Sequence, residues 1–320
     1  MSISVNQTAM RVVEEIIRSR NELGIIVERD STGATLLDAG VRAPGGYAAG
    51  VAMTELCLAG LGKAHVFHAR YGDVSLPSIF VETAYPAIAT LGSQLAGWQI
   101  KTDNYSAMGS GPGRAIALKP KEVYEEIGYT DRSEKAVMIL ESDSKPTGEA
   151  IQYISKKCKV SPENLFVMVA PTSSVAGSVQ ISGRVVEAGI HKLSGVGFDP
   201  KKILSGCGYA PIAPIHPKAG QAMGRTNDAI CYGGEAYYTV DSEDDEKLKM
   251  LVARAPSSTA REYGKPFYEI LKAANYDFYN IDPNLFAPAV VSINNIRTGM
   301  TYTAGNINTD VLKKTMGILN

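Results

Sequence analysis

Four polar residues recur at helical spacing within residues 176–193, which read AGSVQISGRVVEAGIHKL. Gln180, Arg184, Glu187 and His191 follow one another at intervals of four, three and four, so on a helix they share one side. The guanidinium would then lie beside the carboxylate and keep it ionised unless burial outweighs that effect. In a pocket such a carboxylate can act as a general base on water, whereas on a solvated helix face the two residues form only a surface ion pair. Spacing alone favours the surface pair, and both interpretations stay open at this point.

The remaining residues of this stretch predict a helix that packs tightly. Its apolar face repeats at three-, four- and seven-residue intervals and consists of Val179, Val186, Ile190 and Leu193. The run is interrupted by Gly177, Gly183 and Gly189, although an interior glycine costs a helix about 1 kcal/mol relative to alanine. We therefore expect another part of the protein to approach this backbone closely.

A glycine-rich segment, GSGPGR at residues 109–114, is a second candidate site. Its backbone N–H groups and its guanidinium could bind an anion, so we predict that Ser110, Gly111, Pro112 and Arg114 contact the substrate. The segment lacks the Gly-Lys-Ser/Thr of a nucleotide-binding P-loop, and Pro112 and Arg114 break the dinucleotide pattern G-x-G-x-x-G. A tight turn that binds nothing is the alternative.

A third candidate is the run Arg225, Thr226, Asn227 and Asp228, which precedes a predicted strand at residues 229–240. The run offers several hydrogen-bond donors and a carboxylate acceptor in consecutive positions, which suits the recognition of a polar ring. We therefore include the four residues among the candidate substrate-binding residues. The alternative is a turn that closes a loop, in which an Asn or Asp side chain bonds to the backbone.

Composition limits the class of protein. The 320 residues are 45% hydrophobic and 20% charged, which is typical of a soluble globular protein with a large core. With 32 basic and 33 acidic residues the net charge is −1, so bulk electrostatics does not favour a nucleic-acid partner. No apolar run approaches the roughly 20 residues of a membrane span. The N-terminal sequence lacks the features of a signal peptide.

The cysteines and histidines do not predict a metal site. The cysteines, which lack C-x-x-C spacing and lie in apolar or glycine-rich contexts, are Cys57, Cys158, Cys207 and Cys231. Such contexts favour buried thiols and a cytoplasmic protein. His65 and His68 fall in a predicted strand, where they would face opposite sides. We therefore expect no bound metal.

Helical and strand-like segments alternate along the chain, which predicts a mixed α/β (α+β) fold. A charged stretch at residues 120–145 suggests a boundary, so we place an N-terminal lobe at 1–135 and a C-terminal lobe, which carries the Arg184/Glu187 helix, at 136–320. The alternative that the two lobes are intertwined stays open. The sequence AMGSGPGRAI at 107–116 is echoed by AMGRTNDAI at 222–230, with one residue fewer. The echo predicts an internal duplication, with two similar lobes that face each other across a cleft.

Four motifs, which include the three candidate sites above, are together far more specific than any one of them alone. They are GRVVEAGIHKL, AMGSGPGRA, CGYAPIAPIHPK and AMGRTNDAICYGG. In this order they resemble the methenyltetrahydromethanopterin cyclohydrolases of archaeal one-carbon metabolism. The resemblance extends over nearly the whole chain, from ATLLDAGV near residue 35 to GNINTDVL near residue 305. It implies an enzyme of methanogenic metabolism that reversibly hydrolyses 5,10-methenyl-tetrahydromethanopterin to the 5-formyl form, with no metal or redox cofactor.

The resemblance also implies roles for single residues. In that family a glutamate and the arginine three residues before it form the catalytic pair on the first motif, and they fall on Glu187 and Arg184. The pterin is expected in the cleft between the lobes, and the subunits are expected to form a homotrimer in the cytoplasm. Members of the family are often strongly acidic, and the net charge of −1 departs from that pattern. The alternative function is a non-catalytic oligomeric protein that binds a pterin or another anion.

Overall fold

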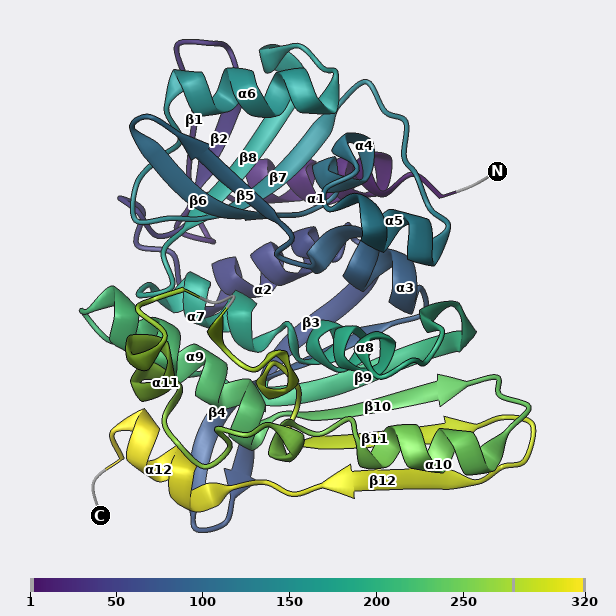
Figure 1. Cartoon of the computed structure of the whole chain (residues 1–320). Helices are drawn as coiled ribbons and strands as arrows, with labels where there is room; N and C mark the ends of the chain where they lie inside the picture. The colour runs from purple at the N-terminus through teal and green to yellow at the C-terminus, as the bar shows by residue number, and fades with distance from the viewer. Residues whose placement is uncertain (1–2, 278–279, 319–320) are drawn as a thin grey trace. The chain divides into compact units, whose positions relative to one another are not determined.

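The computed structural model describes residues 3–277 and 280–318. The chain divides into two compact units (Figure 1). The first unit consists of residues 1–63 and 87–180, and the second unit of the remainder. Each unit contains one six-stranded sheet, and the two are described in turn.

The sheet of the first unit has the strand order β1-β2-β8-β7-β6-β5. Its strands are β1 (Ile26–Arg29), β2 (Thr35–Asp38), β5 (Trp98–Thr102), β6 (Tyr105–Ser110), β7 (Ala136–Glu141) and β8 (Leu165–Ala170). The pairs β2–β8 and β8–β7 are parallel, and the other pairs are antiparallel. The central strands β7 and β8 read AVMILE and LFVMVA and are almost entirely buried, because helices cover both faces of a parallel region.

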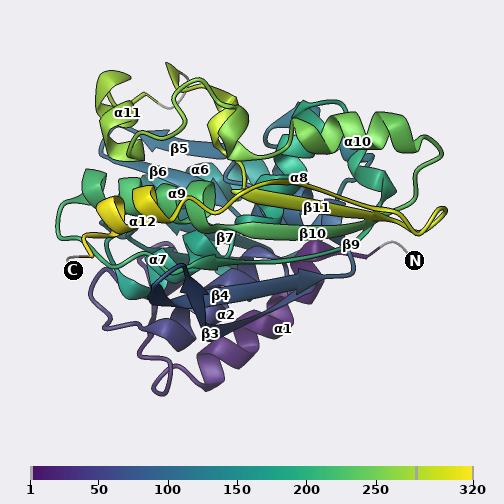
Figure 2. The same cartoon turned by 90° about the horizontal axis from the view of Figure 1, so that it is seen from below.

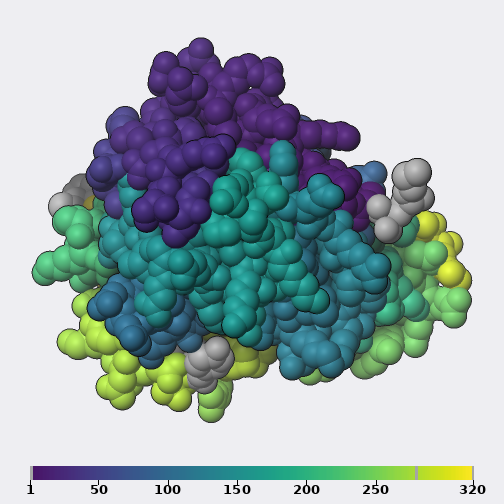
Figure 3. Space-filling view, turned by 90° about the horizontal axis from the view of Figure 1, so that it is seen from above, coloured from purple at the N-terminus to yellow at the C-terminus, as the bar shows by residue number. Residues whose placement is uncertain are grey.

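Helices pack against this sheet within the first unit. They are α1 (Val5–Arg18), α2 (Tyr47–Cys57), α4 (Gly113–Ala117), α5 (Lys121–Ile127) and α6 (Gly148–Cys158), with the π-helix η1 (Thr90–Gln94) and the 3-10 helix η2 (Pro162–Asn164). The apolar side of α6 places Ile151 and Ile154 in one cluster with Met138 and Val167 of the sheet. Figure 3 shows N-terminal residues (purple) against residues from the middle of the chain (teal), as the pairing of β2 with β8 requires.

The sheet of the second unit has the strand order β12-β11-β10-β9-β4-β3. Its strands are β3 (Gly62–Tyr71), β4 (Val74–Thr83), β9 (Ile203–Pro211), β10 (Glu235–Val240), β11 (Val290–Asn295) and β12 (Thr301–Gly305). The pair β10–β11 is parallel, whereas β4–β9, β9–β10 and β11–β12 are antiparallel.

The helices of the second unit surround a core of their own. They are α8 (Val185–Gly195), α9 (Ala219–Gly233), α10 (Asp245–Ala253), α11 (Phe267–Ala273) and α12 (Thr309–Met316), with the 3-10 helices η3 (Pro200–Lys202), η4 (Ser257–Thr259) and η6 (Pro283–Leu285). Two further helices, α3 (Pro86–Ala89) and α7 (Val175–Ser182), span the points where the chain passes between the units. Tyr232, Phe267 and Leu312 bring α9, α11 and α12 into one apolar cluster. Figure 2 shows α9 and α12 side by side.

The predicted mixed α/β fold with two lobes is confirmed, and two six-stranded mixed sheets are consistent with a duplicated arrangement. The sequence echo does not mark equivalent positions, however. Residues 107–116 span β6 and α4, whereas residues 222–230 lie inside α9. The sheets also differ, because the first has two adjacent parallel pairs and the second has one. The cleft between the lobes stays a prediction.

The compact units differ from the predicted lobes at 1–135 and 136–320. A boundary after residue 135 would separate β6 from β7, which are hydrogen-bonded neighbours in one sheet. The charged stretch at 120–145 contains α5 and β7 and belongs to the first unit. Its charge reflects exposed positions on that unit and does not mark a linker.

Two smaller expectations have clear outcomes. The strand predicted at 229–240 begins only at Glu235, because α9 continues to Gly233. The cysteines are free thiols, as predicted: three are buried, and Cys207 is half-buried. Among the described residues, no helix combines the length and apolar character needed to cross a membrane.

Candidate active site

The chain does not form one helix over residues 176–193, as the sequence predicted. Helix α7 ends at Ser182 and α8 begins at Val185, so the helix is broken at Gly183 and Arg184. Arg184 is the N-cap residue of α8, with φ −87° and ψ 4°, and its carbonyl accepts a hydrogen bond from the N–H of Ala188 at 2.8 Å. After proline, glycine has the lowest helix propensity, so Gly183 weakens the helix at this point. The break places Arg184 at the start of a new helix.

Glu187 lies in the first turn of α8. The unpaired N–H groups at a helix N-terminus carry a partial positive charge, which stabilises a carboxylate placed there. The sequence predicted Arg184 and Glu187 as neighbours in the middle of a helix. In the structure they keep their spacing of three but occupy a helix terminus, which is the better place for an ionised carboxylate.

Burial distinguishes between the two interpretations of this pair. Arg184 is 9% exposed and Glu187 is 7% exposed, so they are not a solvated surface pair. Taking charged side chains out of water is unfavourable for folding unless other interactions compensate for it. A buried guanidinium and a buried carboxylate at one helix terminus therefore indicate a functional site.

The other two members of the predicted polar stripe differ from this pair in their surroundings. Gln180 belongs to α7 and is buried in the first unit, where its Oε1 lies 4.0 Å from the Sγ of Cys57. His191 is exposed. The break after α7 removes the helical register that the stripe required.

Close contacts explain two of the three glycines of this stretch, Gly177 and Gly189, as predicted. A Cβ atom on Gly177 would lie 2.0 Å from the carbonyl oxygen of Pro171. A Cβ atom on Gly189 would lie 2.0 Å from the hydroxyl oxygen of Tyr238 in β10. A Cβ atom does not approach another atom this closely, so a side chain at either position would displace its neighbour.

Sequence reasoning did not single out Lys192, which is buried near the end of α8. Its Nζ lies 3.1 Å from the hydroxyl of Thr259 and 2.5 Å from Oδ1 of Asn284. Burial lowers the pKa of Lys192 to about 8, against the opposing charge of Asp282 and with a smaller contribution from Arg254. These contacts attach α8 to η4 and η6. No sequence pattern joins residues so far apart.

The glycine-rich segment 109–114 forms the end of β6 and the start of α4. Ser110 is buried, and Gly111 has a φ of +101° that favours glycine. The carbonyl of Pro112 accepts a hydrogen bond from Nδ2 of Asn6 at 2.9 Å. The segment is thus a tight strand-to-helix turn, and its predicted contact with substrate stays a prediction.

Arg114 is fully buried within the first unit. Its Nε donates to the carbonyl of Lys119 at 2.7 Å, and its Nη1 donates to the carbonyls of Leu91 and Ser93 at 3.2 and 3.1 Å. The guanidinium carbon also lies 5.6 Å from the centre of the Tyr124 ring. These contacts join the turn to η1 and give Arg114 a structural role.

The run from Arg225 to Asp228 lies inside α9, so the alternative of a turn that closes a loop is wrong. Consecutive residues of a helix point about 100° apart, so these four side chains point in different directions. Arg225 Nη1 donates to two carbonyls of the preceding loop at 3.3 and 3.4 Å. The hydroxyl of Thr226 and Nδ2 of Asn227 both donate to the carbonyl of Met223, at 3.0 and 2.9 Å. The predicted contact of these four residues with substrate stays a prediction.

Asp228 is buried in the core of the second unit. Its Oδ1 accepts a hydrogen bond from the N–H of Phe267 at 2.9 Å. Burial raises the pKa of Asp228 to about 8, although that hydrogen bond opposes the shift. At neutral pH this side chain is therefore mostly an uncharged acid that joins α9 to α11.

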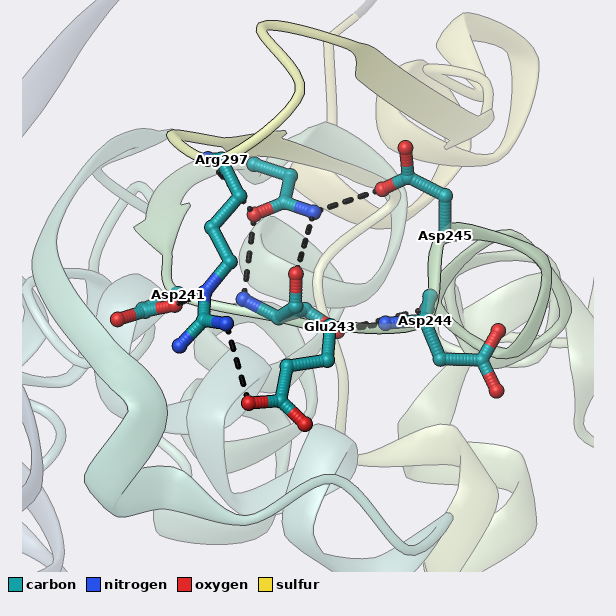
Figure 4. Close-up of polar contacts among 7 residues, drawn as sticks. Asp241, Glu243, Asp244, Asp245 and Arg297 are labelled. Atoms are coloured by element: carbon teal, nitrogen blue, oxygen red, sulfur yellow. Dashed lines mark hydrogen bonds and ion pairs between the residues drawn. The ribbon is translucent and has the colours of Figure 1, made fainter.

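The acidic turn before α10 contains a separate group of charges (Figure 4). Arg297 forms ion pairs with Asp241 and, at 3.0 Å, with Glu243. Asn295 is buried and donates to Oδ1 of Asp245 at 2.7 Å. The group links the turn to the end of β11, and its carboxylates are paired with cations or amides. Among the described residues, no set of three or more His, Cys, Asp or Glu is placed to hold a metal ion.

In this two-sheet α/β chain, the buried Arg184 caps the helix whose first turn holds the buried Glu187. This arrangement is the candidate site for a class of enzymes that use acid–base chemistry on a polar substrate. Comparison with known proteins agrees with this class. The family model "Cyclohydrolase (MCH)" matches residues 4–316. The chain belongs to the MCH cyclohydrolase family.

Curated relatives match over almost their full length. The methenyltetrahydromethanopterin cyclohydrolase of Methanococcoides burtonii is 47% identical over 318 residues, which are 99% of this chain and 99% of the relative. The proteins of the same name from Methanothermobacter marburgensis and Methanocaldococcus jannaschii are also 47% identical. These alignments cover 99% and 98% of this chain, and 100% and 98% of the relatives.

Proposed function

We propose that this chain is a methenyltetrahydromethanopterin cyclohydrolase. The reaction is the reversible hydrolysis of 5,10-methenyl-tetrahydromethanopterin to the 5-formyl form. Similarity to relatives of that name over the whole chain supports this activity. The observation that carries the mechanism is the burial of Glu187 in the first turn of a helix that begins directly after Arg184.

Glu187 acts as the general base. It takes one proton from water as the water oxygen forms a bond to the cationic methenyl carbon, which leaves a neutral hydroxylated adduct. The protonated Glu187 then gives this proton to N10 as the bond between that carbon and N10 breaks. The hydroxyl proton leaves to solvent as the formyl C=O forms, so hydrolysis releases one proton overall.

Arg184 orients Glu187 and keeps its carboxylate ionised. A nearby cation favours the charged form of a carboxyl group, and the N-terminus of α8 acts in the same direction. The substrate cation also attracts Glu187 before the reaction. Arg184 balances that attraction, because stabilising the bound substrate as strongly as the transition state would give no gain in rate.

The protein needs no metal or redox cofactor for this reaction, because the methenyl carbon is already electrophilic. We further propose, from the family resemblance, that the enzyme is a cytoplasmic homotrimer. Light scattering of the purified protein tests the oligomer: a trimer has three times the subunit mass of 34.2 kDa.

The test of the function is a spectrophotometric assay of methenyl absorbance with the purified protein and its Glu187→Gln variant. The wild type should remove the absorbance. The variant should still bind the pterin but lose about 10²–10⁴-fold in kcat, which is the usual contribution of a general base. Glu243→Gln, at an exposed carboxylate in the acidic turn, is the matched control and should keep full activity. Full activity in Glu187→Gln would end the mechanism, and pterin binding by the wild type without turnover would instead support the non-catalytic alternative.

A further inference from the structure

Tyr238 reaches the active-site helix from the sheet of the second unit. It lies in β10, its side chain is fully buried, and its hydroxyl donates a hydrogen bond to the carbonyl of Val186 at 2.8 Å. Val186 directly precedes Glu187 in the first turn of α8. The hydrogen bond therefore acts on the peptide group from which Glu187 projects.

Two glycines make the space for this ring. A Cβ atom on Gly189, one turn after Val186, would lie 2.0 Å from the Tyr238 hydroxyl oxygen and 3.0 Å from Cζ. A Cβ atom on Gly206 in β9 would lie 3.1 Å from Cδ1 of the same ring and 3.1 Å from Cγ1 of Val186. The helix and the neighbouring strand thus both lack a side chain where Tyr238 passes.

Packing alone gives little reason for this arrangement. An interior glycine weakens a helix by about 1 kcal/mol relative to alanine. A smaller apolar residue at position 238 would fill a core position without requiring the missing side chain at Gly189. What tyrosine adds is a fixed hydrogen bond to the first turn of α8.

The hydroxyl keeps its proton over the whole working range of pH. Burial, followed by the negative charge of Glu187, raises the pKa of Tyr238 well above its usual value of 10.0. Tyr238 consequently remains a hydrogen-bond donor to Val186 whatever the protonation state of other groups.

We propose that Tyr238 is a positioning residue, which holds the first turn of α8 so that the carboxylate of Glu187 keeps its reactive orientation. The proposal rests on the proposed function of Glu187 as the general base. A displacement of about 1 Å of a catalytic group can lower the rate by about 100-fold, even when the change lies outside the reacting atoms. Gly189 contributes to this positioning, because the absence of a side chain there allows the Tyr238 hydroxyl to reach the carbonyl of Val186.

The test compares Tyr238→Phe with Tyr232→Phe. Tyr232 is the matched control, because it is also fully buried in the second unit and its hydroxyl also donates to a main-chain carbonyl, that of Lys265 at 2.6 Å. Tyr238→Phe loses one hydrogen bond, whereas Tyr232→Phe loses two, because the Tyr232 hydroxyl also accepts the N–H of Gly264 at 3.1 Å. Thermal melting should therefore report a loss of stability in the control at least as large as in Tyr238→Phe. We expect kcat per folded subunit to fall by about 10- to 100-fold in Tyr238→Phe, with KM changed less than about threefold, and to stay unchanged in Tyr232→Phe.

A second variant, Gly189→Ala, reaches the same contact from the helix side. It should lower kcat in the same way, because its methyl group displaces the Tyr238 hydroxyl, and it keeps the proposal testable if Tyr238→Phe does not fold. Unchanged kcat in the folded variants, or an equal loss of kcat in Tyr232→Phe, would overturn the positioning role. Either result beside an inactive Glu187→Gln leaves the proposed function intact, whereas an active Glu187→Gln overturns that function itself.

Discussion

A Cβ atom placed on Gly50 of α2 would lie 2.4 Å from the Cβ of Val179 in α7. It would also lie 3.0 Å from the carbonyl oxygen of Ala176, so the two helices of the first unit approach each other backbone to backbone at this point. The contact matters for the candidate active site because α7 ends two residues before Arg184. A shift of α7 would displace the start of the active-site segment.

The first prediction concerns this contact. Gly50→Ala should lower the free energy of unfolding by about 1–3 kcal/mol, because the added methyl group overpacks a site with no free space. Urea unfolding measures the change. Gly148→Ala is the control: its methyl group would have one neighbour within 4 Å, Cγ2 of Thr32 at 3.4 Å, and it should be tolerated. Equal stability of the two variants would contradict the close approach.

Helical spacing singled out Arg184 and Glu187, and the family motifs suggested their catalytic role, because both are local properties of the sequence. That role stays a prediction. The sequence also predicted that the glycines mark close contacts. It could not identify the partner of Gly189, since Tyr238 lies in a distant strand and only the fold brings the two together. The break before α8 was missed for a related reason. Apolar periodicity continued through Gly183, and only packing decides whether a glycine ends a helix.

Long-range pairing also explains the other differences. The charged stretch at 120–145 resembled a linker, but β7 within it pairs with β6 and β8 in the centre of a sheet. The run from Arg225 to Asp228 resembled a loop because of its polar residues, but α9 buries Thr226 and Asp228 against the core. In both cases tertiary contacts outweighed local composition.

The second prediction separates a structural from a ligand-binding role for Arg114. Lysine cannot reproduce the planar group that donates to the carbonyls of Leu91, Ser93 and Lys119. Arg114→Lys should therefore lower the free energy of unfolding by about 2–4 kcal/mol while KM for the pterin stays within about twofold. Arg42→Lys, at an exposed arginine of the same unit, should change neither quantity. A large rise in KM at unchanged stability would favour the anion-binding role instead.

The third prediction is a pH dependence at Asp228. Burial raises its pKa from 3.8 to about 8, so between these pH values the folded protein holds a proton that the unfolded chain releases. The contribution of Asp228 to the free energy of unfolding is thus fully present below about pH 4 and is lost as pH rises towards 8. In Asp228→Asn the amide oxygen can still accept the N–H of Phe267, but it does not titrate. The variant should show a flatter stability curve over this window and gain most, relative to wild type, above pH 8.

Asp282, in the same unit, should make stability depend on pH in the opposite direction, because its pKa is lowered. Burial, the largest effect, raises its pKa, but hydrogen bonds from Arg261 and Asn284 together outweigh it and the pKa lies below 3.8. Asp282 therefore adds stability above about pH 4 that is lost in acid. Asp282→Asn should lose stability at neutral pH, whereas Asp228→Asn should not. If both variants had parallel pH curves, the assignment of a neutral Asp228 would be wrong.

The fourth prediction concerns Lys192 at alkaline pH. Burial lowers its pKa from 10.5 to about 8, so between these values the unfolded chain holds a proton that the folded protein has released. The free energy of unfolding should consequently rise as pH increases from about 8 to 10.5. Lys192→Met removes this rise, although it also leaves Asn284 without its 2.5 Å partner and should lower stability by about 1–3 kcal/mol below pH 8. Chemical unfolding at several pH values measures both effects, with the exposed Lys249→Met as the control that keeps the wild-type slope. If Lys192→Met kept the wild-type rise of the free energy of unfolding between pH 8 and 10.5, burial would not lower the pKa of Lys192. The end of α8, the helix that also carries Glu187, would then be more open to water than the contacts of Lys192 with Thr259 and Asn284 indicate.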